Sequence, residues 1–233
     1  MDWNALIELD KQLLLAVNGS DSLFLDGLAM TLTTASTWIP LYLSLLYMVV
    51  KNNDTVQKIL LILVCAGLCV LLAGAVDDLV VKPNIARLRP THDPEIGSLV
   101  DVVNGYRGGQ YGFFSAHACN TFSIALFMSL MVRSRLLTCF LVGWSLLNCW
   151  TRLYLGVHYP GDILVGLIWG SIVGTSVWLL HRKISSNWST GLNFVSEQYT
   201  STGYMTNDID VVISVFILTL FYAILRACFF LYI

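Results

Sequence analysis

Long apolar stretches alternate with short polar connections along most of the chain. Six of these stretches approach the ~20 residues that an α-helix needs to cross a lipid bilayer. They cover residues 28–50, 59–76, 111–132, 136–155, 163–180 and 211–233. The pattern therefore predicts an all-α integral membrane bundle of six transmembrane helices.

The segment ahead of the first apolar stretch has a different pattern. Residues 3–17 mix polar and apolar side chains, and Leu6, Leu9, Leu13 and Ala16 recur at helical spacing. Such spacing is typical of an amphipathic helix that lies in the membrane interface. We therefore divide the chain into an interfacial segment, a transmembrane core, a cytoplasmic linker and an additional C-terminal helix, which are residues 1–22, 23–183, 184–208 and 209–233.

Composition supports a membrane protein over a soluble one. Hydrophobic residues make up 56% of the chain and charged residues only 12%, whereas soluble domains have roughly 25% charged residues. The net charge of −2 gives no basic face for nucleic acid, so we expect none as a partner. The six cysteines lie in or beside apolar stretches, and we interpret them as small buried residues without disulfides.

Basic residues in the short connections predict the orientation in the membrane. They cluster in three connections, at Lys51 and Lys58, at Arg133 and Arg135, and at Arg182 and Lys183. We expect these connections in the cytoplasm. The N-terminus, the 77–116 loop, the 155–162 turn and the C-terminus then lie outside, and Asp77 and Asp78 end the second span at the water boundary.

Three clusters of polar residues map to the predicted outer side. The first runs from Lys82 to Pro90 and contains Arg87 and Arg89. The second is Phe114-Ser115-Ala116-His117, and the third runs from Arg152 through His158 to Asp162. Basic residues in an outside loop contradict the usual charge rule, so their presence there requires a functional reason.

The order and spacing of these clusters resemble the signature motifs of the type 2 phosphatidic acid phosphatase superfamily. Those motifs are Lys-x6-Arg-Pro, Pro-Ser-Gly-His and Ser-Arg-x5-His-x3-Asp, and the first and third match here at every charged position. Phe114 replaces the proline of the second motif, Ala116 its glycine, and Thr151 the serine of the third. The resemblance covers roughly residues 25–180.

The chemistry of these residues fits phosphoryl transfer. Lys82, Arg89 and Arg152 offer three positive charges and directed donors to phosphoryl oxygens, and Ser115 adds a further donor. His158 is placed to attack phosphorus, and Asp162 to accept a hydrogen bond from its second ring nitrogen. Pro160 suits the first position of the following helix.

His117 comes from another span and is placed to protonate the leaving oxygen. The resemblance implies the same roles for all these residues, with a covalent phosphohistidine and without a metal or other cofactor.

For some residues the sequence allows two roles. Arg87 lies outside the motif pattern, so it either contacts phosphate or only neutralises charge. Tyr106 and Arg107 belong to a glycine-rich loop, 105–112, that is either a lid at the substrate mouth or an ordinary loop. Arg226 in the last stretch is expected to reach the outer interface.

We interpret the chain as a membrane phosphatase of the cell (inner) membrane with an extracytoplasmic active site. Lipid A and undecaprenyl diphosphate are the leading substrates, ahead of phosphatidylglycerol phosphate and phosphatidic acid. The expected partners are the bilayer and a lipid, and the oligomeric state stays open. Two alternatives are a vanadate-dependent haloperoxidase, which shares the motifs, and a transporter, which would distribute its charges along a path through the membrane.

Overall fold

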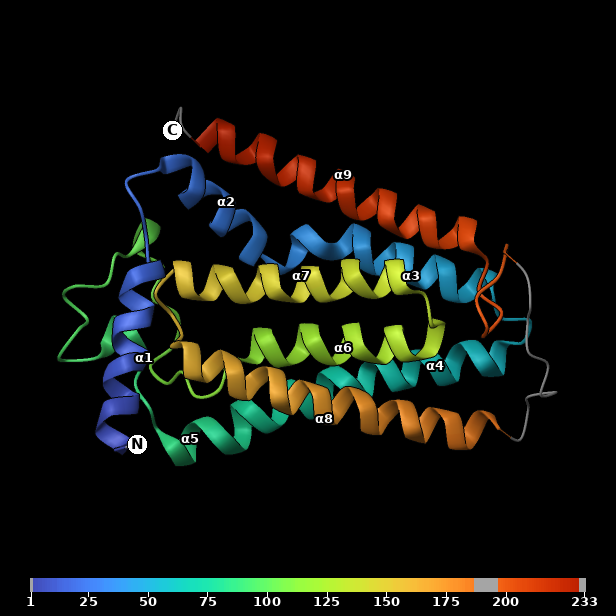
Figure 1. Ribbon diagram of the computed structural model, residues 1–233, viewed down its shortest axis with the longest axis horizontal. Helices are drawn as coiled ribbons and strands as arrows, with labels where there is room; N and C mark the ends of the chain where they lie inside the picture. Colours follow the sequence, from blue (N-terminus) through green and yellow to red (C-terminus); the bar gives the residue numbers. More distant parts are fainter. Residues whose placement is uncertain (1, 187–196, 231–233) are drawn as a thin grey trace.

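The computed structural model describes residues 2–186 and 197–230, and within these ranges the chain folds into helices without a strand. Helix α1 (Trp3–Val17) lies across one end of a bundle of long helices (Figure 1). The bundle is formed by α2 (Leu23–Thr33), α3 (Ile39–Lys51), α4 (Val56–Val70), α5 (Lys82–Ile85), α6 (Ala116–Val132), α7 (Arg135–Tyr154), α8 (Pro160–Ser185) and α9 (Thr206–Phe230). The predicted all-α fold is confirmed.

Four helices of the described residues are long and apolar enough to span a membrane: Val56–Ile85, Arg135–Tyr154, Pro160–Ser185 and Thr206–Phe229. The pair α2 and α3 makes a fifth if it counts as one span, and α6 is a shorter apolar helix of 17 residues. The protein is thus a multi-pass membrane protein, and the number six stays a prediction. Residues 187–196 of the predicted linker and 231–233 of the predicted last span lie outside the described residues.

The first predicted span, 28–50, is not one straight helix. Thr34 adopts an extended conformation, and the two halves of the span meet at an angle of 69°. Side chains beyond the break satisfy the carbonyl groups that it frees: Thr34 Oγ1 donates to Met30, Thr37 Oγ1 to Thr31 and Trp38 Nε1 to Leu32, over 2.7–2.8 Å. Such compensation is what allows a helix to break at membrane depth.

The second span continues beyond Asp77 and Asp78, so the prediction that these residues end it at the water boundary is wrong. Two π-helical turns, η2 (Leu71–Ala75) and η3 (Asp77–Val81), connect α4 to α5. Asp77 is fully buried, and Lys82 five residues later lies against it. A π-turn aligns residues i and i+5, which brings this acid and this base to the same side of the helix.

Helices α6 and α8 pack closely because glycines line the face of α8 toward α6. Gly166, Gly170 and Gly174 follow each other at intervals of four residues, and a Cβ on them would lie 2.6–2.8 Å from backbone oxygens of α6 or its N-cap. Small residues permit this approach of two helices in a membrane. The packing places the beginning of α8, with Asp162, beside the beginning of α6, with Ser115.

Helix α9 covers the broken first span and lies outside the motif region. Phe216 stacks on Trp38 with ring centroids 5.9 Å apart. At the other end, Asp208 accepts hydrogen bonds from Tyr47 and Asn52. All six cysteines are free; four are buried, whereas Cys139 and Cys228 are exposed, so the prediction of burial is wrong for these two.

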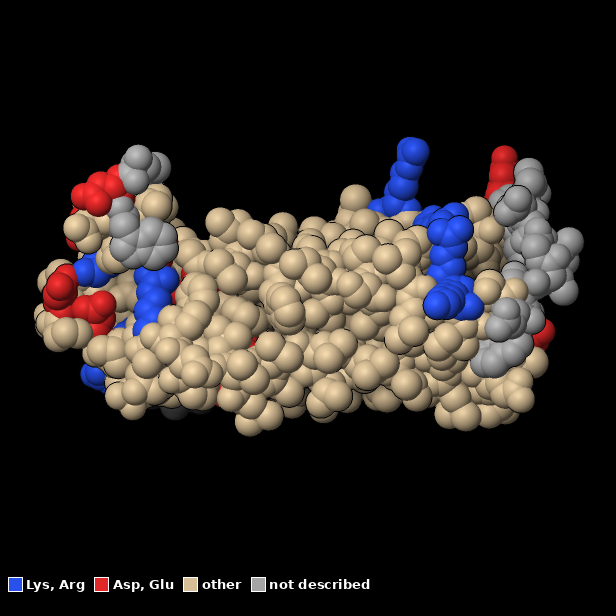
Figure 2. Space-filling view, turned by 90° about the horizontal axis from the view of Figure 1, so that it is seen from below, with Lys and Arg blue, Asp and Glu red and all other residues tan. Residues whose placement is uncertain are grey.

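On the face that Figure 2 shows, charged side chains gather toward the two ends of the bundle, and the belt between them is almost free of charge. The α3–α4 turn, the α6–α7 turn and the end of α8 lie at one end (Figure 1). Helix α1 and the loops before α6 and before α8 lie at the other. The basic connections and the polar motifs are thus at opposite ends, as the predicted orientation requires.

Candidate active site

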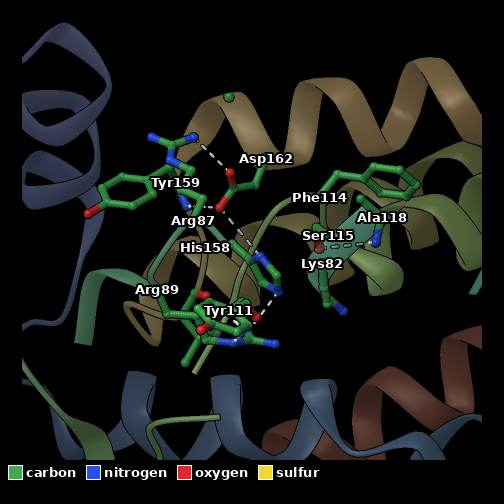
Figure 3. A network of polar contacts seen from close by, with 12 residues as sticks. Lys82, Arg87, Arg89, Tyr111, Phe114, Ser115, Ala118, His158, Tyr159 and Asp162 are labelled. Carbon is green, nitrogen blue, oxygen red and sulfur yellow. Dashed lines mark hydrogen bonds and ion pairs between the residues drawn. The ribbon is translucent and has the colours of Figure 1, made fainter. Parts of the chain in front are cut away.

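His158 lies in the loop between α7 and α8 and is only 1% exposed. Arg89 Nη1 donates a hydrogen bond to His158 Nε2 over 2.9 Å (Figure 3). Because a guanidinium group only donates, Nε2 is the unprotonated nitrogen, and the proton of the neutral ring lies on Nδ1. Burial and the cations Arg89, Arg152 and Lys82 hold the pKa of His158 well below its usual value. The neutral ring therefore presents its lone pair at Nε2.

Asp162, in the first turn of α8, does not form the expected hydrogen bond with His158. Asp162 Oδ2 and His158 Nδ1 are 3.6 Å apart, and Nδ1 has no hydrogen-bond partner among the described residues. The carboxylate is held by other donors: Arg87 Nη1 lies 2.8 Å from Oδ1, and the Tyr159 amide 3.0 Å from Oδ2. An approach closer by roughly 0.5 Å would form the expected bond.

Arg89 is held in place by the loop that precedes α6. Its Nε donates to the Tyr111 carbonyl over 3.1 Å, and its amide donates to the Gln110 carbonyl over 3.0 Å. Gly112 lies directly on it, because a Cβ there would be 3.0 Å from Arg89 Cγ. The second half of the glycine-rich loop is therefore in direct contact with the first motif.

Arg152 reaches from α7 into the interior and is 2% exposed. Its Nη1 donates to Thr33 Oγ1 over 2.6 Å and to Tyr106 Oη over 3.1 Å. Within residues 2–186 and 197–230, neither Arg152 nor Arg89 forms an ion pair with a carboxylate. These two buried charges are therefore available to a phosphoryl group.

The remaining basic residues of the site are paired. Lys82 Nζ lies 2.7 Å from Asp77 Oδ2 and 2.5 Å from Asp78 Oδ1. Asp77 also accepts the Phe114 amide over 3.1 Å, which ties the first motif to the second. Lys82 therefore has fewer donors left for phosphate than the spacing alone implied, although an ammonium group carries three.

Ser115 and His117 begin helix α6. Ser115 is its N-cap: Ser115 Oγ accepts the Ala118 amide over 3.4 Å, and the Ser115 amide donates to the Asp162 carbonyl over 3.1 Å. His117 follows in the first turn and is partly exposed. The first turn of a helix presents free N–H groups and a positive dipole end, a setting that favours an anion.

The structure separates the two possible mouth residues. Tyr106 contacts the interior: its hydroxyl binds Arg152, and the Arg152 guanidinium lies 5.5 Å from the centre of its ring. Arg107 is exposed, and its guanidinium donates to the Thr91 carbonyl over 3.2 Å. Only Tyr106 is thus in contact with a side chain predicted to bind phosphate.

Several partners of the site residues were not predicted from the sequence: Asp10, Thr33, Asp77 and Asp78 as partners of Lys82, and Arg87 as a partner of Asp162. None belongs to a motif spacing, and Asp10 and Thr33 are 77 and 119 residues from the side chains they bind. Only the pair of Asp78 with Lys82 had a local signal, because residues four apart lie on the same face of a helix.

Comparison with known proteins supports the resemblance. The family model of the PAP2 superfamily matches residues 58–186. The chain is 39% identical to a lipid A 4'-phosphatase of Bacteroides thetaiotaomicron, covering 78% of this chain and 80% of that protein. It is 33% identical to a lipid A 4'-phosphatase of Porphyromonas gingivalis, over 78% of this chain and 77% of the relative.

A more distant relative is a decaprenylphosphoryl-5-phosphoribose phosphatase of Mycobacterium tuberculosis, 36% identical over 48% of this chain and 57% of that protein. No solved structure matches the chain at the same level of significance. The family model covers all three polar motifs, and two relatives align over most of both chains. On this evidence the protein belongs to the PAP2 superfamily.

Proposed function

We propose that this protein is a cell-membrane phosphatase that removes the 4'-phosphate of lipid A through a phosphohistidine on His158. The observation that carries the reaction is the buried, neutral His158, whose Nε2 is bound by Arg89 and whose pKa is lowered by Arg89 and Arg152, two arginines that form no ion pair with a carboxylate among the described residues. The substrate rests on the two lipid A 4'-phosphatases that align with most of the chain.

The reaction proceeds in two displacements at phosphorus. Arg89 Nη1 exchanges His158 Nε2 for a phosphate oxygen, and Nε2 attacks phosphorus while the bond to the sugar oxygen breaks. Arg89 and Arg152 balance the charge on the equatorial oxygens, and His117 protonates the leaving oxygen. Water then attacks the phosphohistidine, His117 takes its proton, and inorganic phosphate leaves.

Phosphate release from defined lipids tests the proposal. The purified protein in liposomes is expected to release phosphate from lipid A faster than from undecaprenyl diphosphate or phosphatidylglycerol phosphate, and mass spectrometry should locate the loss at the 4' position. Loss from another position, or faster release from another lipid, would assign a different substrate to the same chemistry.

Metal chelation is expected to leave the activity unchanged. In the proposed mechanism, arginine and lysine side chains supply the positive charge that a divalent ion supplies in other phosphatases. Vanadate adopts the five-coordinate geometry of the transition state and is expected to inhibit. The measurement is phosphate release with and without EDTA; activity that disappears in EDTA and returns with added metal contradicts the mechanism.

The proposed orientation predicts the labelling of single cysteines in intact cells. Leu99, which is 66% exposed at the end that holds the motifs, is replaced by cysteine in a cysteine-free background, and Asp54 in the α3–α4 turn is replaced in a second variant. A membrane-impermeant maleimide should label Leu99→Cys directly but Asp54→Cys only after permeabilisation. The opposite pattern would place the site in the cytoplasm.

A further inference from the structure

Helix α1 lies outside the residues that the family model matches, yet it crosses the end of the bundle that holds the site (Figure 1). Its apolar residues Leu6, Leu9 and Leu13 are 38–48% exposed and point away from the protein, whereas Leu14 is fully buried. An exposed apolar stripe on a helix that lies along a membrane interface faces lipid. Asp10, one turn before the buried Leu14, lies beside this stripe on the side of α1 that packs on the protein.

The Asp10 carboxylate binds two groups next to the predicted nucleophile. Its Oδ2 accepts Arg87 Nη2 over 2.6 Å, and its Oδ1 accepts the Gly161 amide over 2.7 Å. The same guanidinium donates through Nη1 to Asp162 Oδ1, and Gly161 directly precedes Asp162 in the chain. Asp10 thus reaches Asp162 by two routes, one through a side chain and one through the backbone.

Arg87 is a rigid connection in this chain of contacts. Its guanidinium carbon lies over the Tyr159 ring, 4.1 Å from the ring centre (Figure 3). Its two carboxylate partners are 14% and 0% exposed. A planar guanidinium that is stacked and bound at both ends cannot rotate without losing a charge-assisted hydrogen bond. Asp10 therefore contributes, through Arg87, to holding the Asp162 side chain in place.

The position of Asp162 matters because of the 3.6 Å gap to His158 Nδ1. In the proposed function, attack by Nε2 leaves a positive charge on the ring, and a carboxylate at Nδ1 stabilises it only when close and aligned. Displacements of less than 1 Å change such contributions strongly.

We propose that Asp10 is a positioning residue of the phosphoryl-transfer site, acting through Arg87 and Gly161 to hold Asp162 beside His158 Nδ1. The inference rests on the proposed function and makes the interfacial helix part of the catalytic apparatus. The competing interpretation is that Asp10 only anchors α1 to the bundle.

The first experiment compares Asp10→Asn with Glu8→Gln in the full-length protein, reconstituted in liposomes. Glu8 is an exposed acid on the same helix, so both changes remove one negative charge from α1. Asp10→Asn is expected to lower kcat about tenfold, the lower end of the effect of removing outer-shell orienting partners, with KM nearly unchanged. Glu8→Gln should match the wild type in both constants.

A second experiment separates positioning from anchoring. Arg87→Lys keeps the positive charge but replaces the planar fork by a single ammonium. If Asp10 acts through Arg87, adding Asp10→Asn to Arg87→Lys should lower kcat much less than it does in the wild type. Melting temperatures of all variants are measured alongside. Asp10→Asn that lowers the melting temperature and leaves kcat intact overturns the inference, as do equal losses of kcat in both backgrounds.

The substrates distinguish failure of the inference from failure of the proposed function. All variants are assayed on lipid A and on an activated aryl phosphate. A wild type that hydrolyses only the aryl phosphate overturns the lipid assignment, and the Asp10 comparison then decides the inference on that substrate. A wild type that is inactive on both overturns the proposed function and this inference with it.

Discussion

Replacing His158 by alanine is expected to abolish turnover of every phosphorylated substrate, because no covalent intermediate forms without its Nε2. Loss of a covalent nucleophile costs on the order of 10⁶ in kcat in other enzymes. His158→Gln is the matched control for folding, since the glutamine side chain offers Arg89 an acceptor near the original Nε2 position. Both variants should be inactive at wild-type levels of membrane insertion, measured by phosphate release and by labelling of the protein with radioactive phosphate.

His117→Ala should behave differently, because its proposed role is to protonate the leaving oxygen. A sugar or lipid hydroxyl leaves poorly without a proton, whereas a nitrophenolate leaves well alone. The variant should therefore lose most of its activity on lipid A and much less on nitrophenyl phosphate. An equal loss on both substrates would make His117 a phosphate ligand, and measurable turnover by His158→Ala would remove His158 from the role of nucleophile.

Arg152→Met is expected to lower turnover by roughly 10²–10³ without lowering the melting temperature. The loss of turnover follows from removing a preorganised donor to the transferring phosphoryl group. The stability should hold or rise because Arg152 is buried and pairs with no carboxylate in the part of the chain that the structure describes, so its removal relieves a desolvation cost that no ion pair there offsets. Functional sites that hold buried charges commonly lower the stability of the folded protein in this way.

Thermal unfolding with and without vanadate measures both effects for Arg152→Met. Vanadate should raise the melting temperature of the wild type and have little effect on the variant. Arg182→Met, at the opposite end of the bundle beside Trp178, is the control and should keep its activity and its response to vanadate. An Arg152→Met protein that unfolds at a lower temperature and still turns over normally would show that Arg152 is a packing residue.

The sequence predicts those features that depend on local pattern. Residues 136–155 and 163–180 are close to α7 and α8, and Pro160 begins α8 as its position before an apolar stretch indicates. The motif residues converge at one end because apolar helices of similar length run antiparallel between short turns. The family spacing therefore named most of the side chains that the structure brings together at this end, and their roles stay predictions.

Other features depend on contacts that no local pattern encodes. The bend at Thr34 has no proline or glycine at the break, and hydropathy alone gives an uninterrupted span. The pairing of Asp77 with Lys82 requires a π-turn, since ordinary helical spacing would not align residues five apart. The sequence allows two roles for Arg87 because its two carboxylate partners come from α1 and α8, which only the folded bundle brings together.

The covering of the broken first span by the last helix has a consequence for synthesis of the protein. Phe216, which stacks on Trp38, follows it by 178 residues (216 − 38). At about 5–20 residues per second, the ribosome completes that interval in roughly 10–35 s. During this time the bend at Thr34, which follows the Arg152-binding Thr33, lacks the packing of α9. The broken first span is therefore inserted and bent before the helix that covers it has been made.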